Sequence, residues 1–266
     1  MAGILEGKVA IVTGASSGIG EGVTRLFCKE GAKVAFIARR AEKSQKIVDE
    51  ITAAGGEVTY VQGDVTKTED LDRLFNTCVE KYGAPDILVG HAGIGAAFDV
   101  HEANLEDVLD PVFNMNIRAN MYLTKLVLPG MMEKGGGSII FTSSNVGTNC
   151  GSAKASTYGI TKAGHDSFVK SLCMAYGQYN IRANTIRPGV ITTELSPKDG
   201  YMERMQLPFI PMHRPGTVEE IAQAYLFLAS DLCPYINGVD LLCDGGVNCG
   251  ILFPTPEGYD DEGKLL

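Results

Sequence analysis

A tyrosine and a lysine stand four positions apart in the segment STYGITKAG, residues 156–164. If this segment is helical, Tyr158 and Lys162 lie on one face, one turn from each other. A free phenol has a pKa near ~10 and is a poor base at neutral pH. An ammonium about 5 Å away, at an effective dielectric of ~20, would favour the phenolate by roughly 3 kcal/mol, or about two pKa units. The pair therefore suits acid/base chemistry; the alternative is an amphipathic helix whose long polar side chains reach solvent.

A second candidate site is the segment TGASSGIG, residues 13–20, which follows a short apolar run and precedes a helix-like stretch. Glycines in such a turn permit positive φ and let the backbone approach a ligand closely. The turn can then offer N–H groups and a helix N-terminus to a pyrophosphate, and its alternative is a glycine-rich turn without a ligand. We expect the cofactor contacts of this turn to come from Gly14, Ser16, Ser17, Gly18, Ile19 and Gly20.

Two arginines, Arg39 and Arg40, follow the second apolar run, where a site for NAD typically carries an acid that binds the ribose hydroxyl. A carboxylate would repel a 2′-phosphate, whereas a guanidinium can bind it with paired hydrogen bonds. The pattern predicts a preference for NADP(H), led by Arg39, with NAD(H) as the alternative cofactor. Two solvated surface charges are the competing interpretation.

The elements that position these residues alternate along the whole chain. Short β-branched runs predict strands at 8–13, 33–37, 58–62, 87–89, 138–142, 181–186 and 239–243. Helical spacing predicts helices at 18–30, 41–54, 68–82, 106–133, 156–179 and 218–229. This alternation indicates a Rossmann-like α/β fold, a doubly wound parallel β-sheet flanked by helices on both faces. Ligands of such sheets bind at the carboxyl ends of the strands, where each motif falls.

Composition narrows the classes of protein further. The chain has 266 residues, and because no linker or charge block divides it we expect one domain spanning 1–266. A net charge of −9 disfavours nucleic acid as a partner. The start has no signal-peptide pattern and no apolar run reaches bilayer length, so we expect a cytoplasmic protein that does not enter a membrane. The 7 cysteines are scattered and the 4 histidines are unclustered, which favours free thiols and gives no support for a metal site.

Several motifs in order make the chain similar to the classical short-chain dehydrogenases/reductases: TGASSGIG, HAG at 91–93, NMNIRAN, FTSSN, YGITK and RPGVITTEL at 187–195. Together they are specific and cover residues 8–246. The resemblance implies that Tyr158 is the acid/base, Lys162 its helper, and Ser144 the hydroxyl that orients the substrate oxygen. Asn116 matches the residue that supports a water relay near the lysine. A secondary alcohol would then exchange hydride with the nicotinamide.

The resemblance also assigns further cofactor contacts. Asp64 and Val65 match a pair that contacts adenine, although a strand-ending turn explains them equally well. Ala92 and Gly93 approach the adenosine ribose, and His91, the first residue of the same motif, is counted with them among the cofactor contacts. Pro188, Gly189, Ile191 and Thr193 match positions near the carboxamide and phosphates. Tyr158 and Lys162 also contact the cofactor.

Two departures from the family pattern concern the site. Gly90 and His91 replace two asparagines, and we favour a core or solvated imidazole for His91 over a functional one. The family often has Ser144 and Tyr158 thirteen positions apart, whereas here 158 − 144 = 14, which indicates a one-residue insertion in NVGTNCGSAKA. Ser143 is therefore the alternative to Ser144.

The substrate is the least determined part. Residues 194–217 match the family's substrate lid and contain Met202, Met205, Leu207, Phe209, Ile210 and Met212, which suit either a bulky apolar ligand or packing on the protein itself. The tail 247–266 resembles tails of bacterial hydroxysteroid dehydrogenases. A steroid or bile acid is therefore the leading small-molecule substrate, ahead of another carbonyl compound, a polyol or a 3-oxoacyl thioester. A non-catalytic NADP(H)-binding regulator is the alternative class. The family implies a homotetramer or homodimer packed through 106–133 and 156–179, where Ala163, Gly164 and Ser167 allow close approach or pack within the subunit.

Overall fold

A computed structural model describes residues 3–250, and within them seven parallel strands form one sheet in the order β3-β2-β1-β4-β5-β6-β7. The strands are β1 (Val9–Thr13), β2 (Lys33–Ala38), β3 (Glu57–Gln62), β4 (Ile87–Gly90), β5 (Gly137–Thr142), β6 (Ile181–Pro188) and β7 (Asp240–Cys243). The central strands are buried along their whole length, as expected of β-branched runs in a sheet covered on both faces. The predicted doubly wound, Rossmann-like sheet is confirmed.

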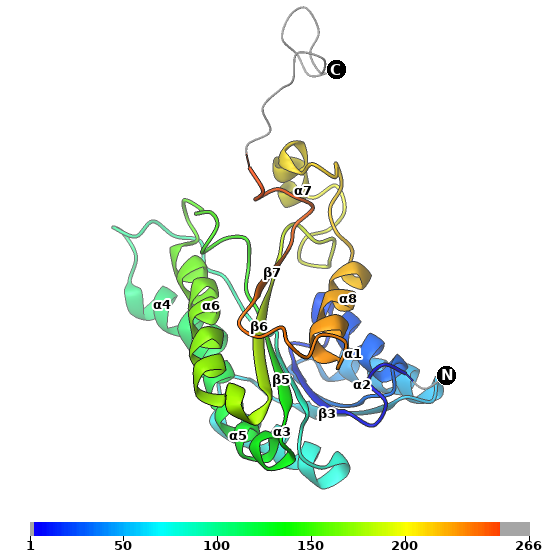
Figure 1. The fold of residues 1–266 in the computed structure, drawn as a ribbon. Helices are drawn as coiled ribbons and strands as arrows, with labels where there is room; N and C mark the ends of the chain where they lie inside the picture. The colour runs from blue at the N-terminus through cyan, green and yellow to red at the C-terminus, as the bar shows by residue number, and fades with distance from the viewer. Residues whose placement is uncertain (1–2, 251–266) are drawn as a thin grey trace, which may run out of the picture.

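Helices cover both faces of this sheet (Figure 1). One face carries α1 (Gly18–Lys29), α2 (Ala41–Ala53) and α8 (Val218–Ala229), whose apolar residues share a core with β1 and β2. The other face carries α3 (Thr68–Tyr82), α5 (Ala119–Lys134) and α6 (Ser156–Tyr176), which build a second core. The predicted helices at these positions agree with the structure, except that α6 ends at Tyr176 and a short 3₁₀ turn, Gly177–Tyr179, follows it.

The predicted helix at 106–133 is present, but it is not α-helical throughout. It consists of α4 (Leu105–Phe113), a π-helical turn over Asn114–Arg118, and α5. Asn116, a predicted site residue, lies buried inside the π turn. Single π turns inside α-helices occur frequently at functional sites, and hydrophobic spacing alone does not reveal them.

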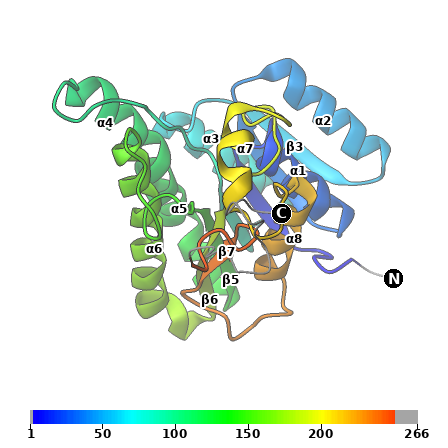
Figure 2. The same cartoon turned by 90° about the horizontal axis from the view of Figure 1, so that it is seen from above.

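The segment 194–217 contains a helix that the sequence did not predict, α7 (Tyr201–Gln206), followed by a 3₁₀ turn over Leu207–Phe209. Figure 2 looks down on this end of the molecule and shows α7 between the two helical layers. Ile210 packs inside the protein at 2% exposure, whereas Met205, Phe209 and Met212 are exposed. Packing on the protein is therefore confirmed for Ile210, while contact with a bulky apolar ligand stays a prediction for the exposed side chains.

Other expectations meet the structure only in part. Of the tail 247–266, residues 251–266 lie outside the described residues. Within residues 3–250, none of the helices combines the length and the apolar character needed to cross a bilayer. The same residues contain no group of three or more histidine, cysteine or acidic side chains arranged to hold a metal ion.

Candidate active site

A cavity of about 850 Å³ lies at the carboxyl ends of the strands. This volume falls within the range of cofactor and substrate pockets, roughly 300–1,000 Å³. Its walls come from loops that follow β1, β2, β4, β5 and β6, together with α6 and the start of the lid segment. Strand ends that are remote in sequence therefore meet at one place, as the parallel sheet requires.

Most of the predicted site residues line this cavity. After β1 to β3 they are Gly14, Ser16, Ser17, Ile19, Arg39, Arg40 and Val65. After β4 to β6, and on α6, they are His91, Ala92, Gly93, Ser144, Tyr158, Lys162, Pro188, Gly189, Ile191 and Thr193. Four predicted residues, Gly18, Gly20, Asp64 and Asn116, support the wall from behind. Asp64 Oδ1 accepts hydrogen bonds from the backbone and hydroxyl of Thr66, as a strand-ending turn would require, and the adenine contact stays a prediction.

The glycine-rich turn can approach a pyrophosphate closely because glycine leaves its backbone uncovered, whereas any larger residue at two of its positions would clash. Gly14 has φ +70°, and a Cβ there would lie 3.0 Å from Ala92 Cα. A Cβ at Gly20 would lie 2.4 Å from the Gly14 carbonyl oxygen, so α1 packs directly on the end of β1. Since α1 begins at Gly18, the first N–H groups of a helix stand beside this turn, an arrangement that favours anions. The residues present therefore fit a nicotinamide dinucleotide.

Arg40, more than Arg39, is tied to this turn. Its guanidinium donates hydrogen bonds of 3.0 Å to Ser16 Oγ and 2.5 Å to Ser17 Oγ, and pairs with Glu194 at 3.4 Å. Glu194 also accepts a 2.7 Å hydrogen bond from Lys43, and the two cations hold the pKa of Glu194 below its ordinary value. Among residues 3–250 the hydrogen bonds that other side chains donate to the Ser16 and Ser17 hydroxyls come from Arg40, while Arg39 is exposed on the cavity wall. Lys43 and Glu194 escaped sequence analysis because their meeting depends on the lid's course.

Tyr158 and Lys162 share one face of α6, as their spacing predicts. The Lys162 Nζ lies 5.5 Å from the centre of the Tyr158 ring and donates a 2.6 Å hydrogen bond to the Thr142 carbonyl. Lys162 is buried, which lowers its pKa to about 8, while the nearby Asp166 carboxylate opposes that change. Burial likewise raises the pKa of Tyr158, and a hydrogen bond with Ser144 opposes the rise. The expected net lowering of the Tyr158 pKa by Lys162 is thus not seen in the protein itself, where removal from water is the largest influence on this pKa.

Of the two candidate serines, Ser144 faces the tyrosine. Its hydroxyl lies close enough to Tyr158 to oppose the rise of the phenol pKa, and it donates a 3.3 Å hydrogen bond to Asn145 Oδ1 and accepts a 3.1 Å hydrogen bond from the Val146 N–H. Ser143 instead donates a 3.0 Å hydrogen bond to the Lys162 carbonyl, on the helix side of the strand end. The extra residue before Tyr158 therefore does not move Ser144 away from the phenol.

Asn116, in the π turn, lies close to Lys162 and to the loop that follows β4. Its side-chain amide donates to the Ile94 carbonyl and accepts from the Ile94 N–H, both at 2.9 Å. A Cβ at Gly93 would lie 3.2 Å from Asn116 Oδ1 and 3.3 Å from Lys162 Nζ, so both polar groups border the same glycine. The Asn116 carbonyl accepts a 2.7 Å hydrogen bond from His165 Nε2, a buried histidine whose pKa falls to about 3 through burial and the Lys162 charge.

His91 belongs to the framework beneath the turn. Its Nδ1 lies 2.9 Å from Thr142 Oγ1, which in turn lies 2.5 Å from the Tyr225 hydroxyl on α8. The pKa of His91 falls to about 3 because the ring is withdrawn from water and the Lys162 charge is near. This neutral, hydrogen-bonded imidazole agrees with the structural role favoured from the sequence. Thr142 and Tyr225 were not singled out there, since a threonine at a strand end carries no distinctive signal.

Comparisons with known proteins agree with this geometry. A sequence model of the family described as "Enoyl-(Acyl carrier protein) reductase" matches residues 14–248. The 3-oxoacyl-[acyl-carrier-protein] reductase of Thermotoga maritima is 36% identical, over 91% of this chain and 98% of its own. The 7alpha-hydroxysteroid dehydrogenase of Escherichia coli is 32% identical, over 91% of this chain and 94% of its own. A crystal structure of a short-chain type dehydrogenase/reductase from Mycobacterium marinum superposes with a TM-score of 0.86 at 32% identity, covering 92% and 97% of the two chains.

Proposed function

The chain belongs to the classical short-chain dehydrogenase/reductase family, whose members are oxidoreductases that bind NAD(P)(H), and on that premise we propose that it interconverts a secondary alcohol and a ketone. One observation carries the proposal: Ser144, Tyr158 and Lys162 adjoin one another on the wall of the cavity that also holds the glycine-rich turn. A non-catalytic NADP(H)-binding regulator would have no need of these three side chains together.

The proposed mechanism assigns the proton to Tyr158. When bound, the nicotinamide supplies hydride to the carbonyl carbon in reduction, or accepts it from the alcohol carbon in oxidation. In reduction the Tyr158 hydroxyl gives its proton to the carbonyl oxygen, and in oxidation the phenolate takes the alcohol proton. Lys162, held by its hydrogen bond to the Thr142 carbonyl, stabilises the phenolate that reduction leaves behind. Ser144 donates to the substrate oxygen and orients it.

The proposed cofactor is NADP(H). Three cations, Arg39, Arg40 and Lys43, lie within or beside the part of the cavity that follows β2, and an acid does not follow this strand. A guanidinium binds a 2′-phosphate with paired hydrogen bonds, and Arg40 is already directed at the turn that would hold the pyrophosphate. NAD(H) is the alternative.

A hydroxysteroid or bile acid is the proposed substrate class. Support comes from the exposed apolar side chains of the lid segment, among them Leu195 at 94% exposure, which suit a large rigid apolar ligand. The similarity to a 7alpha-hydroxysteroid dehydrogenase points the same way. A 3-oxoacyl thioester is the second candidate, favoured by the similarity to a 3-oxoacyl-[acyl-carrier-protein] reductase.

A substrate screen tests both candidates. Keto steroids, oxo bile acids, acetoacetyl thioesters and simple sugars are each incubated with the protein and NADPH, and the loss of absorbance at the nicotinamide band is followed. Turnover of an oxo steroid or bile acid above the other compounds supports the first choice. Turnover of the thioester alone selects the second candidate, and bound NADPH that reduces none of the ketones overturns the enzyme proposal.

We also propose a homodimer or homotetramer that packs through α5 and α6. A shallow groove between these helices is lined by Met121, Leu128, Pro129, Phe168 and Tyr176. Met121 is 49% exposed and adjoins the apolar lining of this groove, so the two together form an apolar face. Gly164, by contrast, packs inside the subunit, because a Cβ there would lie 3.1 Å from Ile117 Cδ1. Light scattering of wild type and Met121→Lys would test the proposed face, since a charge there should lower the oligomeric mass.

A further inference from the structure

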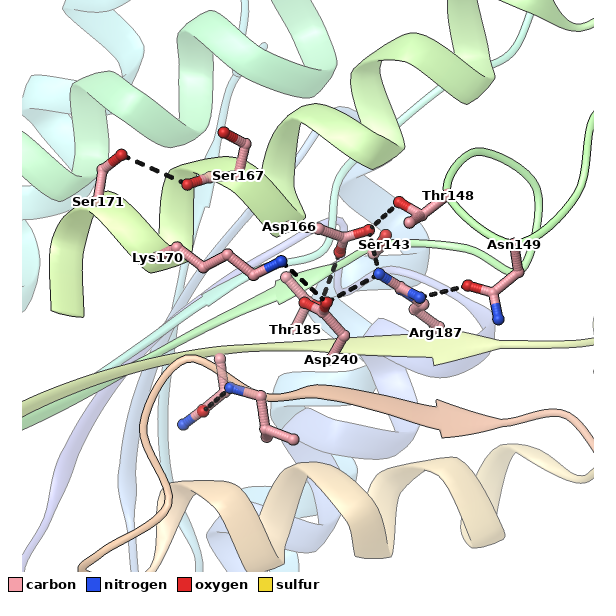
Figure 3. A network of polar contacts seen from close by, with 12 residues as sticks. Ser143, Thr148, Asn149, Asp166, Ser167, Lys170, Ser171, Thr185, Arg187 and Asp240 are labelled. Carbon is pink, nitrogen blue, oxygen red and sulfur yellow. Dashed lines mark hydrogen bonds and ion pairs between the residues drawn. The ribbon is translucent and has the colours of Figure 1, made fainter. Parts of the chain in front are cut away.

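A buried ion pair joins β6 to α6 immediately behind the proposed active site. Arg187 Nη2 lies 2.7 Å from Asp166 Oδ2, and the two side chains are 7% and 4% exposed. Figure 3 shows Arg187 extended between Asp166 on one side and Asn149 on the other, with Asp240 below. Taking two charges out of water is costly, and the attraction between them often does no more than offset that cost. A contribution to stability alone is therefore a weak explanation for this pair.

Both members of the pair adjoin residues already placed in the site. Asp166 follows Lys162 by one turn of α6, and Arg187 directly precedes Pro188 and Gly189 on the cavity wall. Neither lines the cavity, so neither is expected to touch substrate or cofactor. Any effect on the reaction must pass through a neighbour.

That neighbour is the segment 143–155, here called the serine loop, which begins with Ser143 and Ser144 and ends where α6 starts. Thr148 Oγ1 donates a 2.7 Å hydrogen bond to Asp166 Oδ2, and Arg187 Nη1 donates to the Asn149 side-chain oxygen. These two contacts fall four and five positions after Ser144, within the stretch that is one residue longer than the family pattern. Gly147 presses the same loop onto α6, since a Cβ there would lie 2.8 Å from the Gly159 carbonyl oxygen.

The other side of the pair is held without the loop. Thr185 Oγ1 donates to Asp166 Oδ1 at 2.9 Å and lies 3.0 Å from Asp240 Oδ1, while Asp240 Oδ2 accepts from Arg187 at 2.9 Å. Thr148 and Thr185 thus bind opposite oxygens of one carboxylate. One hydroxyl belongs to the serine loop and the other to the sheet, which provides a matched pair of substitutions.

We propose that Asp166 and Arg187 are positioning residues that anchor the serine loop through Thr148 and Asn149 and so hold the Ser144 hydroxyl against Tyr158. The inference rests on the proposed function, because it gives Ser144 a part in the reaction. With the anchor in place the longer loop has one course across α6. Without it Ser144 samples positions from which it does not reach the phenol, and the fraction of molecules ready to react falls.

Hydrogen exchange tests the anchor without an enzyme assay. In full-length Thr148→Val, amides of residues 143–155 should exchange about tenfold faster than in wild type, since one hydrogen bond to a charged group is worth about that factor. Thr185→Val, which removes a bond to the same carboxylate from the sheet side, should leave exchange in the serine loop within about twofold of wild type. Thr148→Ser restores the hydroxyl and should restore protection. Equal acceleration in the Thr148 and Thr185 valine variants would overturn the proposal.

Kinetics with the fastest ketone of the screen and NADPH tests the consequence for the reaction. Thr148→Val should lower kcat by about tenfold with the KM for NADPH unchanged, and Thr148→Ser should recover most of the loss. If kcat falls in proportion to melting temperature, and to the same extent in Thr148→Val and Thr185→Val, the Asp166–Arg187 pair has only a structural role. If wild type reduces none of the ketones, the proposed function fails, while the exchange experiment still decides whether the loop is anchored.

Asp166→Asn adds a readout that loop anchoring alone would not move. The charged or titratable groups around Lys162 are Tyr158, His91, His165 and Asp166, and only Asp166 raises the pKa of the lysine. Its neutralisation should shift the alkaline limb of the kcat profile to lower pH, because Lys162 then loses its proton more readily. Thr148→Val should leave that limb in place. If the alkaline limb of the kcat profile is unchanged in folded Asp166→Asn, Asp166 does not influence the protonation of Lys162, and its role is limited to anchoring the serine loop.

Discussion

Ser143 and Ser144 are neighbours whose hydroxyls have different surroundings: the Ser143 hydroxyl donates to the Lys162 carbonyl at 3.0 Å, whereas the Ser144 hydroxyl lies beside Tyr158 and donates to Asn145 Oδ1 at 3.3 Å. The Ser143 hydroxyl is therefore structural, whereas the Ser144 hydroxyl is the one proposed to act in the reaction. Both are buried, at 2% and 7% exposure, so loss of either hydroxyl leaves a polar group without its partner.

Ser144→Ala should lower kcat by about two to three orders of magnitude, because a donor directed at the reacting oxygen is lost. Ser143→Ala should leave kcat within a few-fold of wild type and reduce the free energy of unfolding by about 1 kcal/mol. Steady-state kinetics and urea denaturation of both variants measure the two effects. The reverse ranking of the two kcat values would make Ser143 the reactive hydroxyl.

Tyr158→Phe should abolish turnover, because the ring remains but the proton donor is gone. Binding of NADPH, followed by quenching or enhancement of its fluorescence, should change by less than about threefold, since the glycine-rich turn and the arginines are untouched. Retained turnover in this variant would refute the acid/base role of the phenol.

Arg40→Ala should raise the KM for NADP⁺ relative to that for NAD⁺ by about tenfold to a hundredfold, the worth of charge-assisted hydrogen bonds to a phosphate. Arg39→Ala, originally the leading candidate, should show a smaller change, because Arg40 is the one already directed at Ser16 and Ser17. Glu194→Gln should tighten NADP⁺ binding, since it frees Arg40 and Lys43 from a competing carboxylate. Identical cofactor ratios in all three variants and wild type would count against the NADP(H) assignment.

His165 makes stability depend on acid. Its pKa is lowered to about 3 in the folded protein, so between pH 6.5 and about 3 the unfolded chain binds a proton that the folded chain does not. Stability contributed by the neutral imidazole is therefore complete above that window and is lost as pH falls through it. His165→Gln keeps a donor for the Asn116 carbonyl but cannot titrate, so near pH 5 its slope should be shallower by about 1.4 kcal/mol per pH unit.

Urea denaturation at pH 7, 6 and 5 measures this slope. His101→Gln, at a histidine whose side chain is 80% exposed, is the matched control and should run parallel to wild type. If the His165 variant also ran parallel, the buried imidazole would be taking up its proton in the folded state.

Much of the fold could be predicted because a parallel sheet covered on both faces leaves a strong signal. Buried runs such as Ile181–Pro188 read as strands, and their ends fell within a few residues of the prediction. The short helix Tyr201–Gln206 left no such signal, since its six residues make too few turns for a repeating apolar face. The π turn was missed for a related reason, because its extra residue shifts the apolar pattern at one point only, while the segments before and after it each keep ordinary α-helical spacing.

The site divides in the same way. Tyr158 and Lys162 were found because their spacing is local, one turn of a single helix. The pairing of Asp166 with Arg187 depends on how β6 lies against α6, and their separation of 21 residues gives no hint of it. A signal was nevertheless present, since Arg182 and Arg187 lie within a predicted strand and a buried guanidinium requires acceptors. Which of Arg39 and Arg40 faces the glycine-rich turn depends on where β2 ends and α2 begins, and the sequence predicts that boundary only to within about one residue.

Because of the π turn over Asn114–Arg118, the orientation of α4 relative to α5 depends on the exact number of residues in the helical arm that α4, the π turn and α5 form together. A helix rotates by about 100° for each residue, so removal of one amino acid within the turn would leave an uninterrupted α-helix whose two halves are rotated against each other. Such a deletion would keep hydrophobicity, charge and helical content almost unchanged, yet it would swing α4 around the axis of α5 and move Asn116 off Ile94. In directed evolution or in natural descent, this arm should therefore accept many substitutions and very few changes of length.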